Sequence, residues 1–166
     1  MILIRAEIAA DRDAIHRVNA AAFETEAEAK LVDALRASAQ PFLSFVAIQG
    51  NEVIGHILYT GVVIEGRHSG LGLAPMSVLT QYQRTGVGSL LARETLKKLR
   101  KAGYPWVVAL GHPEYYPRFG FVPSVQYGIG CEYDAPVEAF MVLELQPGAL
   151  KDVKGIARFH EAFKSV

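Results

Sequence analysis

The sequence predicts a mixed α/β fold, and two stretches of the chain carry that prediction. Residues 42–49 and 53–64 are apolar runs on either side of a Gly-Asn pair, a pattern typical of an antiparallel hairpin. Residues 71–110 read as strand, amphipathic helix and strand, the order of a parallel β-α-β crossover. We expect one domain over residues 1–166, because a chain of 166 residues with 51% hydrophobic content can bury a substantial core.

The N-terminal part is predicted to contain a strand and two helices. Residues 2–8 are largely apolar and read as the strand. Asp11 is expected to cap a helix that runs to about residue 23. A second helix is expected over residues 26–37, and Pro41 prevents it from continuing.

The middle of the chain is predicted to continue from the hairpin into the crossover. Residues 66–70 are expected to form a turn, and residues 71–79 the next strand. The helix that follows is expected over residues 87–102, with a basic C-terminal end that suits the helix dipole and a glycine that ends it. Residues 106–110 are all apolar, which predicts a strand in the centre of the sheet.

The C-terminal third gives weaker signals. Pro113 suits the first turn of a short helix that would contain Tyr115 and Tyr116. Residues 138–145 read as a late strand. The tail from residue 151 is ambiguous, and its apolar residues are candidates to pack a final element on the body, namely Ile156, Phe159 and Phe163.

Composition argues against several classes of protein. Lys plus Arg and Asp plus Glu both total 17, so no strong overall field attracts nucleic acid or an anionic membrane, although a local basic patch is compatible with this balance. Cys131 is the single cysteine, which excludes an intrachain disulfide and is compatible with a reducing compartment. The N-terminus lacks the features of a cleavable signal, and residues 53–64 are too short to span a bilayer. We expect a cytoplasmic protein.

Motifs for other chemistries are missing from the sequence. The five histidines are dispersed, without the spacing of a metal site, so no metal is expected. The sequence also lacks the G-x-S-x-G motif of a serine hydrolase.

The most informative stretch is the glycine-containing loop at residues 83–89. It follows an apolar strand and opens into a helix, whose N-terminus presents unpaired N–H groups and a positive dipole end to an anion. Gly86 and Gly88 allow a phosphate to approach the backbone closely. The loop lacks the Gly-Lys-Ser/Thr of a Walker loop and the third glycine of a Rossmann fingerprint. A structural turn into a helix would also explain the two glycines.

The order of these motifs resembles the GNAT superfamily of N-acetyltransferases. Gln83-x-x-Gly86-x-Gly88 is similar to the acyl-CoA loop of that family, and residues 73–78 are similar to the strand that precedes the loop. Residues 116–121 are similar to the family's Tyr-x-x-x-Gly-Phe. Residues 111–121 and 139–145 resemble the YhbS-like bacterial branch, which extends the resemblance over nearly the whole chain.

The resemblance implies a GNAT-like fold and an acetyltransfer reaction. The expected architecture is a central, mixed but mostly antiparallel, twisted sheet flanked by helices, with the parallel β-α-β unit holding acetyl-CoA. The implied reaction transfers the acetyl group directly to a primary amine of a small-molecule or peptide acceptor. A homodimer is left open.

The resemblance also implies the site residues. The strand would splay after a bulge, so that backbone groups near Met76 and Val78 hold the pantetheine and polarise the thioester carbonyl. The cofactor-binding residues would be Met76, Ser77, Val78, Arg84, Thr85, Gly86, Val87, Gly88 and Ser89. Tyr116 matches the catalytic tyrosine that faces the departing sulfur. A phenol near pKa 10 would protonate a thiolate near 8.5 only at a cost of about 2 kcal/mol, so a hydrogen bond with late protonation is expected.

Several assignments stay open at this point. Tyr116 is also explained as an interior aromatic beside two phenylalanines. No general base is assigned, and the candidates by position are Glu26, Glu28, His56, His112 and Glu138. Many family members carry an asparagine where this chain has Gly111-His112-Pro113, which puts cofactor contacts there in doubt. Arg118 is a candidate to bind a phosphate or a carboxylate of a ligand, but a charged side chain at the surface is the better interpretation.

Two other classes of function also fit the loop. One is an acyl-CoA-binding sensor without catalytic activity, which would have no need for a phenol at the sulfur. The other is an interaction module that binds a nucleotide phosphate with the same loop.

Overall fold

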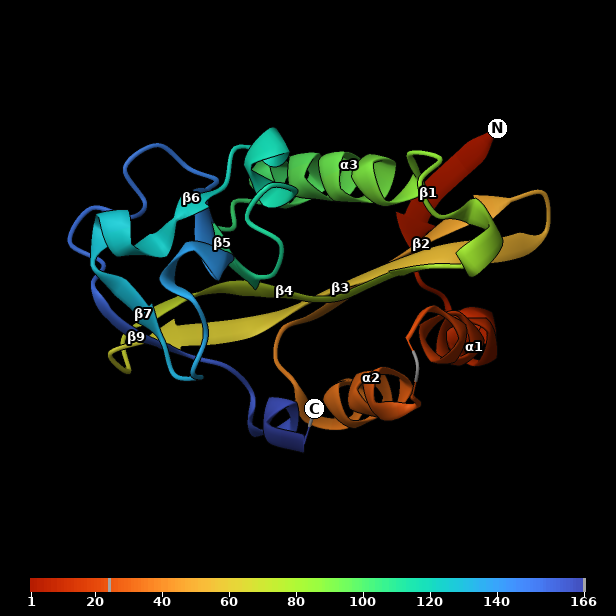
Figure 1. Cartoon of the computed structure of the whole chain (residues 1–166), viewed down its shortest axis with the longest axis horizontal. Coiled ribbons are helices and arrows are strands. Elements are labelled where there is room, and N and C mark those ends of the chain that lie inside the picture. Colours follow the sequence, from red (N-terminus) through yellow and green to blue (C-terminus); the bar gives the residue numbers. More distant parts are fainter. Residues whose placement is uncertain (24, 166) are drawn as a thin grey trace. The chain divides into compact units, whose positions relative to one another are not determined.

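The computed structural model describes residues 1–23 and 25–165 of the chain (Figure 1). The α-helices are α1 (Arg12–Ala22), α2 (Ala27–Ser38) and α3 (Val87–Lys101). The strands are β1 (Ile2–Ala6), β2 (Phe42–Gln49), β3 (Glu52–Ile64), β4 (His68–Val78), β5 (Trp106–Leu110), β6 (Val122–Pro123), β7 (Ile129–Cys131), β8 (Phe140–Glu144) and β9 (Gly155–Arg158). The predicted strands at residues 42–49 and 106–110 have the predicted bounds.

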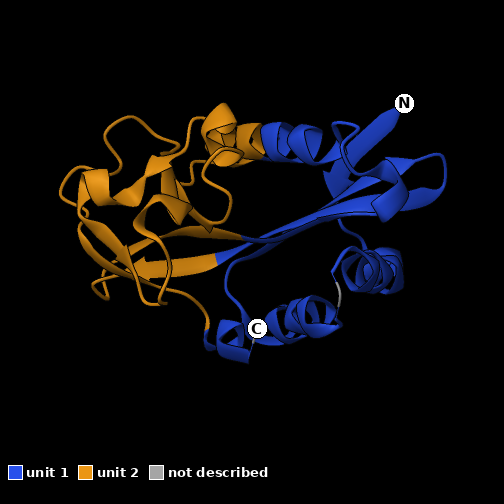
Figure 2. Cartoon of the chain, in the orientation of Figure 1, with its two compact units in different colours: residues 1–60, 74–95, 161–166 blue, residues 61–73, 96–160 orange. Residues whose placement is uncertain are grey.

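The chain forms two compact units (Figure 2). Unit 1 contains residues 1–60, 74–95 and 161–166, and unit 2 contains residues 61–73 and 96–160. The expectation of a single domain over the whole chain stays a prediction. Among the described residues, no helix has the length and apolar character that crossing a bilayer requires.

In unit 1 the strands follow the order β1-β2-β3-β4, and β1, β2 and β3 pair antiparallel. Alternate residues of β3 point to opposite faces of the sheet. Leu58 packs in an apolar cluster with α1 and α2, whereas Gly55 and Tyr59 face the first part of α3. The Tyr59 hydroxyl lies 2.8 Å from Thr95 Oγ1 of α3. Helices therefore cover both faces of these strands, as Figure 1 shows for α1 and α2 on one side and α3 on the other.

In unit 2 the strand order is β3-β4-β5-β8-β6, and β9 pairs with both β3 and β7. The β4–β5 pairing is parallel, and β8 pairs antiparallel with β5 and β6. This confirms the strand–helix–strand unit and the mixed, mostly antiparallel sheet. A buried cluster around Trp106, Val108, Phe140 and Val142 forms the core of the unit.

The predicted turn at residues 66–70 is too long, because β4 begins at His68. Gly70 belongs to this strand rather than to the turn. A Cβ on Gly70 would lie only 2.4 Å from the indole of Trp106, so this glycine makes room for the largest core side chain. A glycine that is required by packing looks the same in sequence as a glycine that is required by a turn.

One prediction about a helix start is confirmed in position only, and another is wrong. Asp11 is the N-cap residue of α1, as predicted, but its side chain makes no capping hydrogen bond to the helix. Its carboxylate instead accepts hydrogen bonds from the Arg5 guanidinium at 2.7 and 3.1 Å and from the Ile8 N–H at 2.8 Å. The short helix that was expected to begin at Pro113 begins later, as a 3-10 helix over Tyr116–Phe119 with Pro117 in its first turn.

The C-terminal region holds short strands that the sequence pattern does not reveal. β6, β7 and β9 have two to four residues each, too few for a periodic signal. Phe159 packs on the core of unit 2 and Phe163 on the helical cluster of unit 1. The expectation that Ile156 packs inward is wrong, since 39% of it is exposed.

Candidate active site

The C-terminal part of β4 has backbone groups that the parallel ladder does not use. Among the described residues, pairing between β4 and β5 covers only Leu71 to Leu73. Pro75, two residues later, has no N–H to donate to a ladder. The Val78 carbonyl accepts a hydrogen bond from the side-chain amide of Gln83 at 3.0 Å. The chain thus leaves the parallel ladder after Leu73, and Gln83 fixes the strand end to the loop.

The loop itself has an unusual backbone. Arg84 has φ of +63° and Gly86 has φ of +96°, both in the left-handed region. The Thr85 hydroxyl donates to the Tyr82 carbonyl and closes the turn. A non-glycine residue in this conformation costs about 1–3 kcal/mol, and such residues cluster at binding sites. Alternation of left- and right-handed residues also turns successive N–H groups toward one side, which is a geometry that binds anions.

Gly86 stands at the start of α3, where its carbonyl accepts the first helical hydrogen bond, from the Leu90 N–H at 3.0 Å. Apart from its two chain neighbours, no described residue has a heavy atom within 4 Å of the position that its Cβ would take. The first turn of α3 contains no acidic side chain that would neutralise the helix dipole. The loop and the helix start therefore leave open space beside N–H groups at the positive end of a helix.

Gly55 of β3 brings the start of α3 close to the sheet. A Cβ at Gly55 would lie 3.0 Å from Leu91 and 3.3 Å from both Val87 and the Ser77 carbonyl. Each of these distances is tighter than ordinary van der Waals contact. Gly55 is a positioning residue that the sequence interpretation missed, because it lies in an apolar strand without any motif.

The side chains of the predicted cofactor-binding residues differ in exposure. Val87 is 1% exposed and packs against Gly55, and Ser77 is 3% exposed. Both can therefore offer only backbone groups to a ligand at the surface. Arg84, Thr85 and Gly86 are exposed, and the others are partly buried, namely Met76, Val78, Gly88 and Ser89. All nine belong to unit 1, where the end of β4 and the start of α3 meet.

Tyr116, the predicted catalytic residue, belongs to unit 2 and is 8% exposed. Its ring makes edge-to-face contacts with Tyr115 and Phe121, with ring centroids 5.4 Å apart in each case. Gly111 lies directly beside the ring, since a Cβ there would be 2.7 Å from Tyr116 Cε2. Gly111 stands in the segment where many family members carry asparagine, and here it makes room for the tyrosine.

Burial, together with the neighbouring Tyr115, raises the pKa of Tyr116 to about 12. The phenol is therefore protonated at every physiological pH and can act as a hydrogen-bond donor. Tyr116 is thus both an interior aromatic and a candidate donor, and its packing defines the direction of the ring.

The candidate bases lie in different surroundings. His56 is fully buried, and both of its ring nitrogens have partners, Asn19 Nδ2 at 3.1 Å and Ser44 Oγ at 2.9 Å. It is a hydrogen-bonded core histidine with no access to a substrate at the surface. The side chain of Glu26 is 62% exposed, and His112 and Glu138 are also exposed.

The part of the chain that the structure describes contains no group of three or more His, Cys, Asp or Glu residues that could hold a metal ion. The thiol of Cys131 is free and half-buried, and its sulfur accepts a hydrogen bond from the Tyr133 N–H at 3.4 Å. Burial raises the pKa of this thiol, which lowers its thiolate fraction and its nucleophilicity.

Comparison with known proteins identifies the family of this chain. The model of the acetyltransferase (GNAT) domain matches residues 40–123. The N-acetyltransferase YhbS of Escherichia coli K12 is 36% identical over 164 residues, which cover 98% of each chain. The chain belongs to the GNAT family of acetyltransferases. The matched region includes β4, the glycine loop, α3 and Tyr116.

Solved structures of relatives show the same GNAT fold. The crystal structure of E. coli YhbS in complex with CoA has a TM-score of 0.93 and 35% identity, covering 98% of this chain and 92% of that one. A GNAT acetyltransferase from Brucella melitensis in complex with acetyl-CoA has a TM-score of 0.81 and 37% identity, covering 98% of both chains. These findings confirm the predicted family, its YhbS-like branch, the fold and the acyltransferase class.

Proposed function

We propose that this GNAT protein binds acetyl-CoA at the glycine loop and transfers the acetyl group directly to a primary amine of a small molecule or peptide. The observation that carries the proposal is the start of α3, where Gly86 leaves open space beside helix N-terminal N–H groups. The two relatives that were crystallised with CoA and acetyl-CoA share at least 35% of its residues over almost the whole chain. A cytoplasmic location remains part of the proposal.

The pyrophosphate would bind to the backbone of the loop from Arg84 to Ser89. The pantetheine arm would lie along β4, where Met76, Ser77 and Val78 follow the last residue paired with β5. An N–H at this strand end would hydrogen-bond the thioester oxygen as negative charge develops on it in the transition state. The side chains of Val87 and Ser77 are buried, so their backbone groups would do this binding.

Tyr116 would donate a hydrogen bond to the sulfur as the carbon–sulfur bond breaks. With the tyrosine pKa at about 12 and a thiol pKa near 8.5, full proton transfer would be uphill by about 5 kcal/mol. This difference between the pKa of the phenol and the pKa of the thiol is larger than it would be for an unperturbed tyrosine. Hydrogen bonding in the transition state, with the thiolate protonated afterwards, is therefore the role that the buried phenol supports.

The amine would attack the thioester carbon itself, without an acetylated enzyme. The nitrogen forms the new bond, CoA leaves as the thiolate, and the proton of the amine passes to water or to a base. Holding the amine against the thioester can contribute several kcal/mol through proximity alone. Cys131 is a poor relay, because its thiol is half-buried and its pKa is raised.

The proposal competes with two binding functions, an acyl-CoA sensor and a nucleotide-phosphate module. The experiment that tests the loop is calorimetric titration of acetyl-CoA, ATP and NAD into wild type and a folded Gly86→Val variant. We expect binding of acetyl-CoA only, weakened about tenfold to a hundredfold by the substitution, as the loss of one hydrogen bond to a charged phosphate predicts.

Gly103 offers a matched control for backbone strain. Its φ is +92°, close to the +96° of Gly86, and its Cβ position is equally open. Gly103→Val should destabilise the fold by a similar amount and leave acetyl-CoA affinity unchanged. Equal affinities in all three proteins would refute binding at the loop, and preferential binding of ATP would favour the nucleotide module.

A further inference from the structure

An exposed face of unit 2, outside the residues assigned above, combines two aliphatic and two charged side chains. Val63 of β3 pairs directly with Arg158 of β9, so both point to the same side of the sheet. Ile156 lies two residues before Arg158 and shares that side. These three residues, with Glu65 and Gly66 after the end of β3, line a hollow of about 450 Å³. Val63, Glu65, Ile156 and Arg158 are called the β3–β9 block below.

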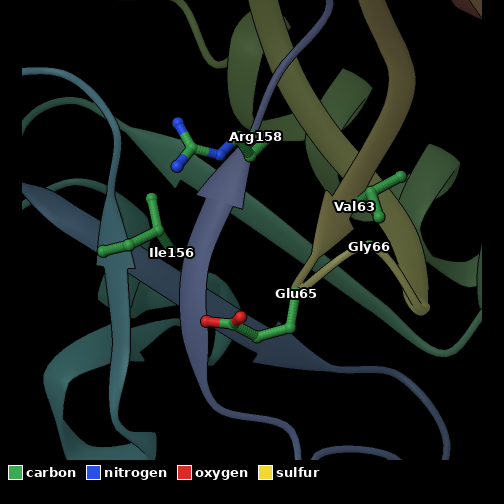
Figure 3. Close-up of a pocket in the computed structure, with 5 residues that line it drawn as sticks. All are labelled: Val63, Glu65, Gly66, Ile156 and Arg158. Atoms are coloured by element: carbon green, nitrogen blue, oxygen red, sulfur yellow. The ribbon is translucent and has the colours of Figure 1, made fainter.

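The four side chains occupy the corners of a four-sided figure. Figure 3 shows Glu65 and Arg158 at opposite corners, and Val63 and Ile156 at the other two. Val63 is 37% exposed and Ile156 39% exposed, values that are high for aliphatic residues in strands. The side chain of Arg158 is 67% exposed, and its contact with the Glu132 carboxylate is long, at 3.8 Å. The guanidinium is therefore available to another partner.

This arrangement is self-complementary. Suppose that two copies of the block face each other and are related by a two-fold axis that lies in the plane of the contact. Each side chain then lies opposite the side chain of the partner whose mirror image across the axis it occupies. With the axis along the line from Val63 to Ile156, each Glu65 meets the partner's Arg158, and this contact occurs twice. The two valines meet on the axis, and so do the two isoleucines. Such an isologous contact is the commonest type in homodimers.

We propose that the β3–β9 block is the centre of a homodimer interface, and that its occupant is a second copy of this chain. An acidic or a basic partner would pair one of the two opposite charges and desolvate the other without compensation, which is costly. A second copy satisfies both charges at once and covers the aliphatic corners. The hollow beside them receives the arm of the partner's Arg158. The proposal is independent of the acetyltransfer reaction, because the block shares no residue with the loop or with Tyr116.

The test is sedimentation velocity over a range of protein concentrations. We expect wild type to shift from monomer to dimer as concentration rises, and to shift less in high salt because the ion pairs are screened. Arg158→Glu and Glu65→Arg should each weaken dimerisation at least about tenfold, since each places like charges opposite one another. The double variant E65R/R158E restores both ion pairs with reversed sign and should recover the dimer.

Two further variants complete the test. Val63→Asp places two carboxylates on the axis and should abolish the dimer without touching the ion pairs. Val137→Asp is the control, because Val137 is 62% exposed but lies outside the block. Its dimerisation should equal that of wild type. Circular dichroism checks that each variant is folded. If Glu65→Arg does not fold, the Val63→Asp and Arg158→Glu variants still test whether the β3–β9 block forms the interface. A wild type that stays monomeric, or a dimer that survives both Arg158→Glu and Val63→Asp, would overturn the proposal.

Discussion

Stability should fall between pH 7 and pH 5 because of His56. In unit 1, Asn19 Nδ2 is 3.0 Å from the Ile15 carbonyl and 3.1 Å from His56 Nδ1. An amide nitrogen only donates, so Nδ1 accepts and the proton lies on Nε2, which donates to Ser44 Oγ. Protonation of Nδ1 would set two donors against each other inside the core. Burial of the ring is the main cause that lowers its pKa to about 3, and the Arg36 charge adds to it although Glu7 opposes it.

The size of the effect follows from proton linkage. The ordinary pKa of 6.5 holds in the unfolded chain, and the folded value is about 3, so the unfolded state binds the extra proton as pH falls below 6.5. The stability that neutral His56 contributes is full above pH 6.5 and is lost progressively toward pH 3. Between pH 7 and pH 5 this loss lowers the free energy of unfolding by about 2 kcal/mol. As long as the pKa of His56 in the folded state is well below 5, the size of the loss depends only on its pKa in the unfolded state.

Urea unfolding of wild type and His56→Gln at several pH values from 7 to 5 measures this loss. The variant should be less stable than wild type at pH 7. Between pH 7 and pH 5, however, its free energy of unfolding should fall by about 2 kcal/mol less than that of wild type. The contributions of the other titrating groups are common to both proteins and cancel in this comparison. An NMR titration of the His56 ring in wild type, which should remain neutral at pH 5, gives an answer even if the variant does not fold. Parallel pH profiles, or a ring that titrates near 6.5, would refute the reasoning.

Two predictions concern the reaction. Tyr116→Phe should lower kcat by about tenfold to a hundredfold with little change in KM for acetyl-CoA, whereas Tyr115→Phe should change kcat little. Gly111→Ala should lower kcat as well, because its Cβ displaces the Tyr116 ring; an unchanged kcat in both Tyr116→Phe and Gly111→Ala, with chemistry rate-limiting, would count against the assigned role. Intact-protein mass spectrometry after incubation with acetyl-CoA alone should find no stoichiometric acetyl adduct on Cys131, and Cys131→Ser should keep its turnover. An adduct that discharges to the amine would replace direct transfer by a relay.

Elements with a strong local hydrophobic pattern could be predicted from the sequence, and elements defined by packing could not. The strand at residues 106–110 is uniformly apolar and was predicted to the residue, as was the first strand of the hairpin. Gly70 was misread because its reason for being glycine is Trp106, which lies 36 positions later in the chain. Asp11 was misread because its partner is Arg5 rather than the helix that it precedes.

The same limit applies to the site. The order of strand, glycine loop and helix could be predicted, since each signal lies within a short window. Gly55 and Gly111 could not be recognised, because each is explained only by a side chain that the fold brings beside it. Gln83 belongs to the recognised motif, but its contact with the Val78 carbonyl appears only in three dimensions.

The most direct test of the proposed activity measures CoA release and N-acetylated product together. The protein is incubated with acetyl-CoA and a panel of aliphatic amines, amino acids and short peptides with free N-termini. We predict at least one primary amine whose N-acetylated product appears in a one-to-one ratio with free CoA thiol, and whose dimethylated analogue gives neither. Binding of acetyl-CoA without amine-dependent thiol release across the panel would contradict acetyltransfer to such amines and favour the sensor.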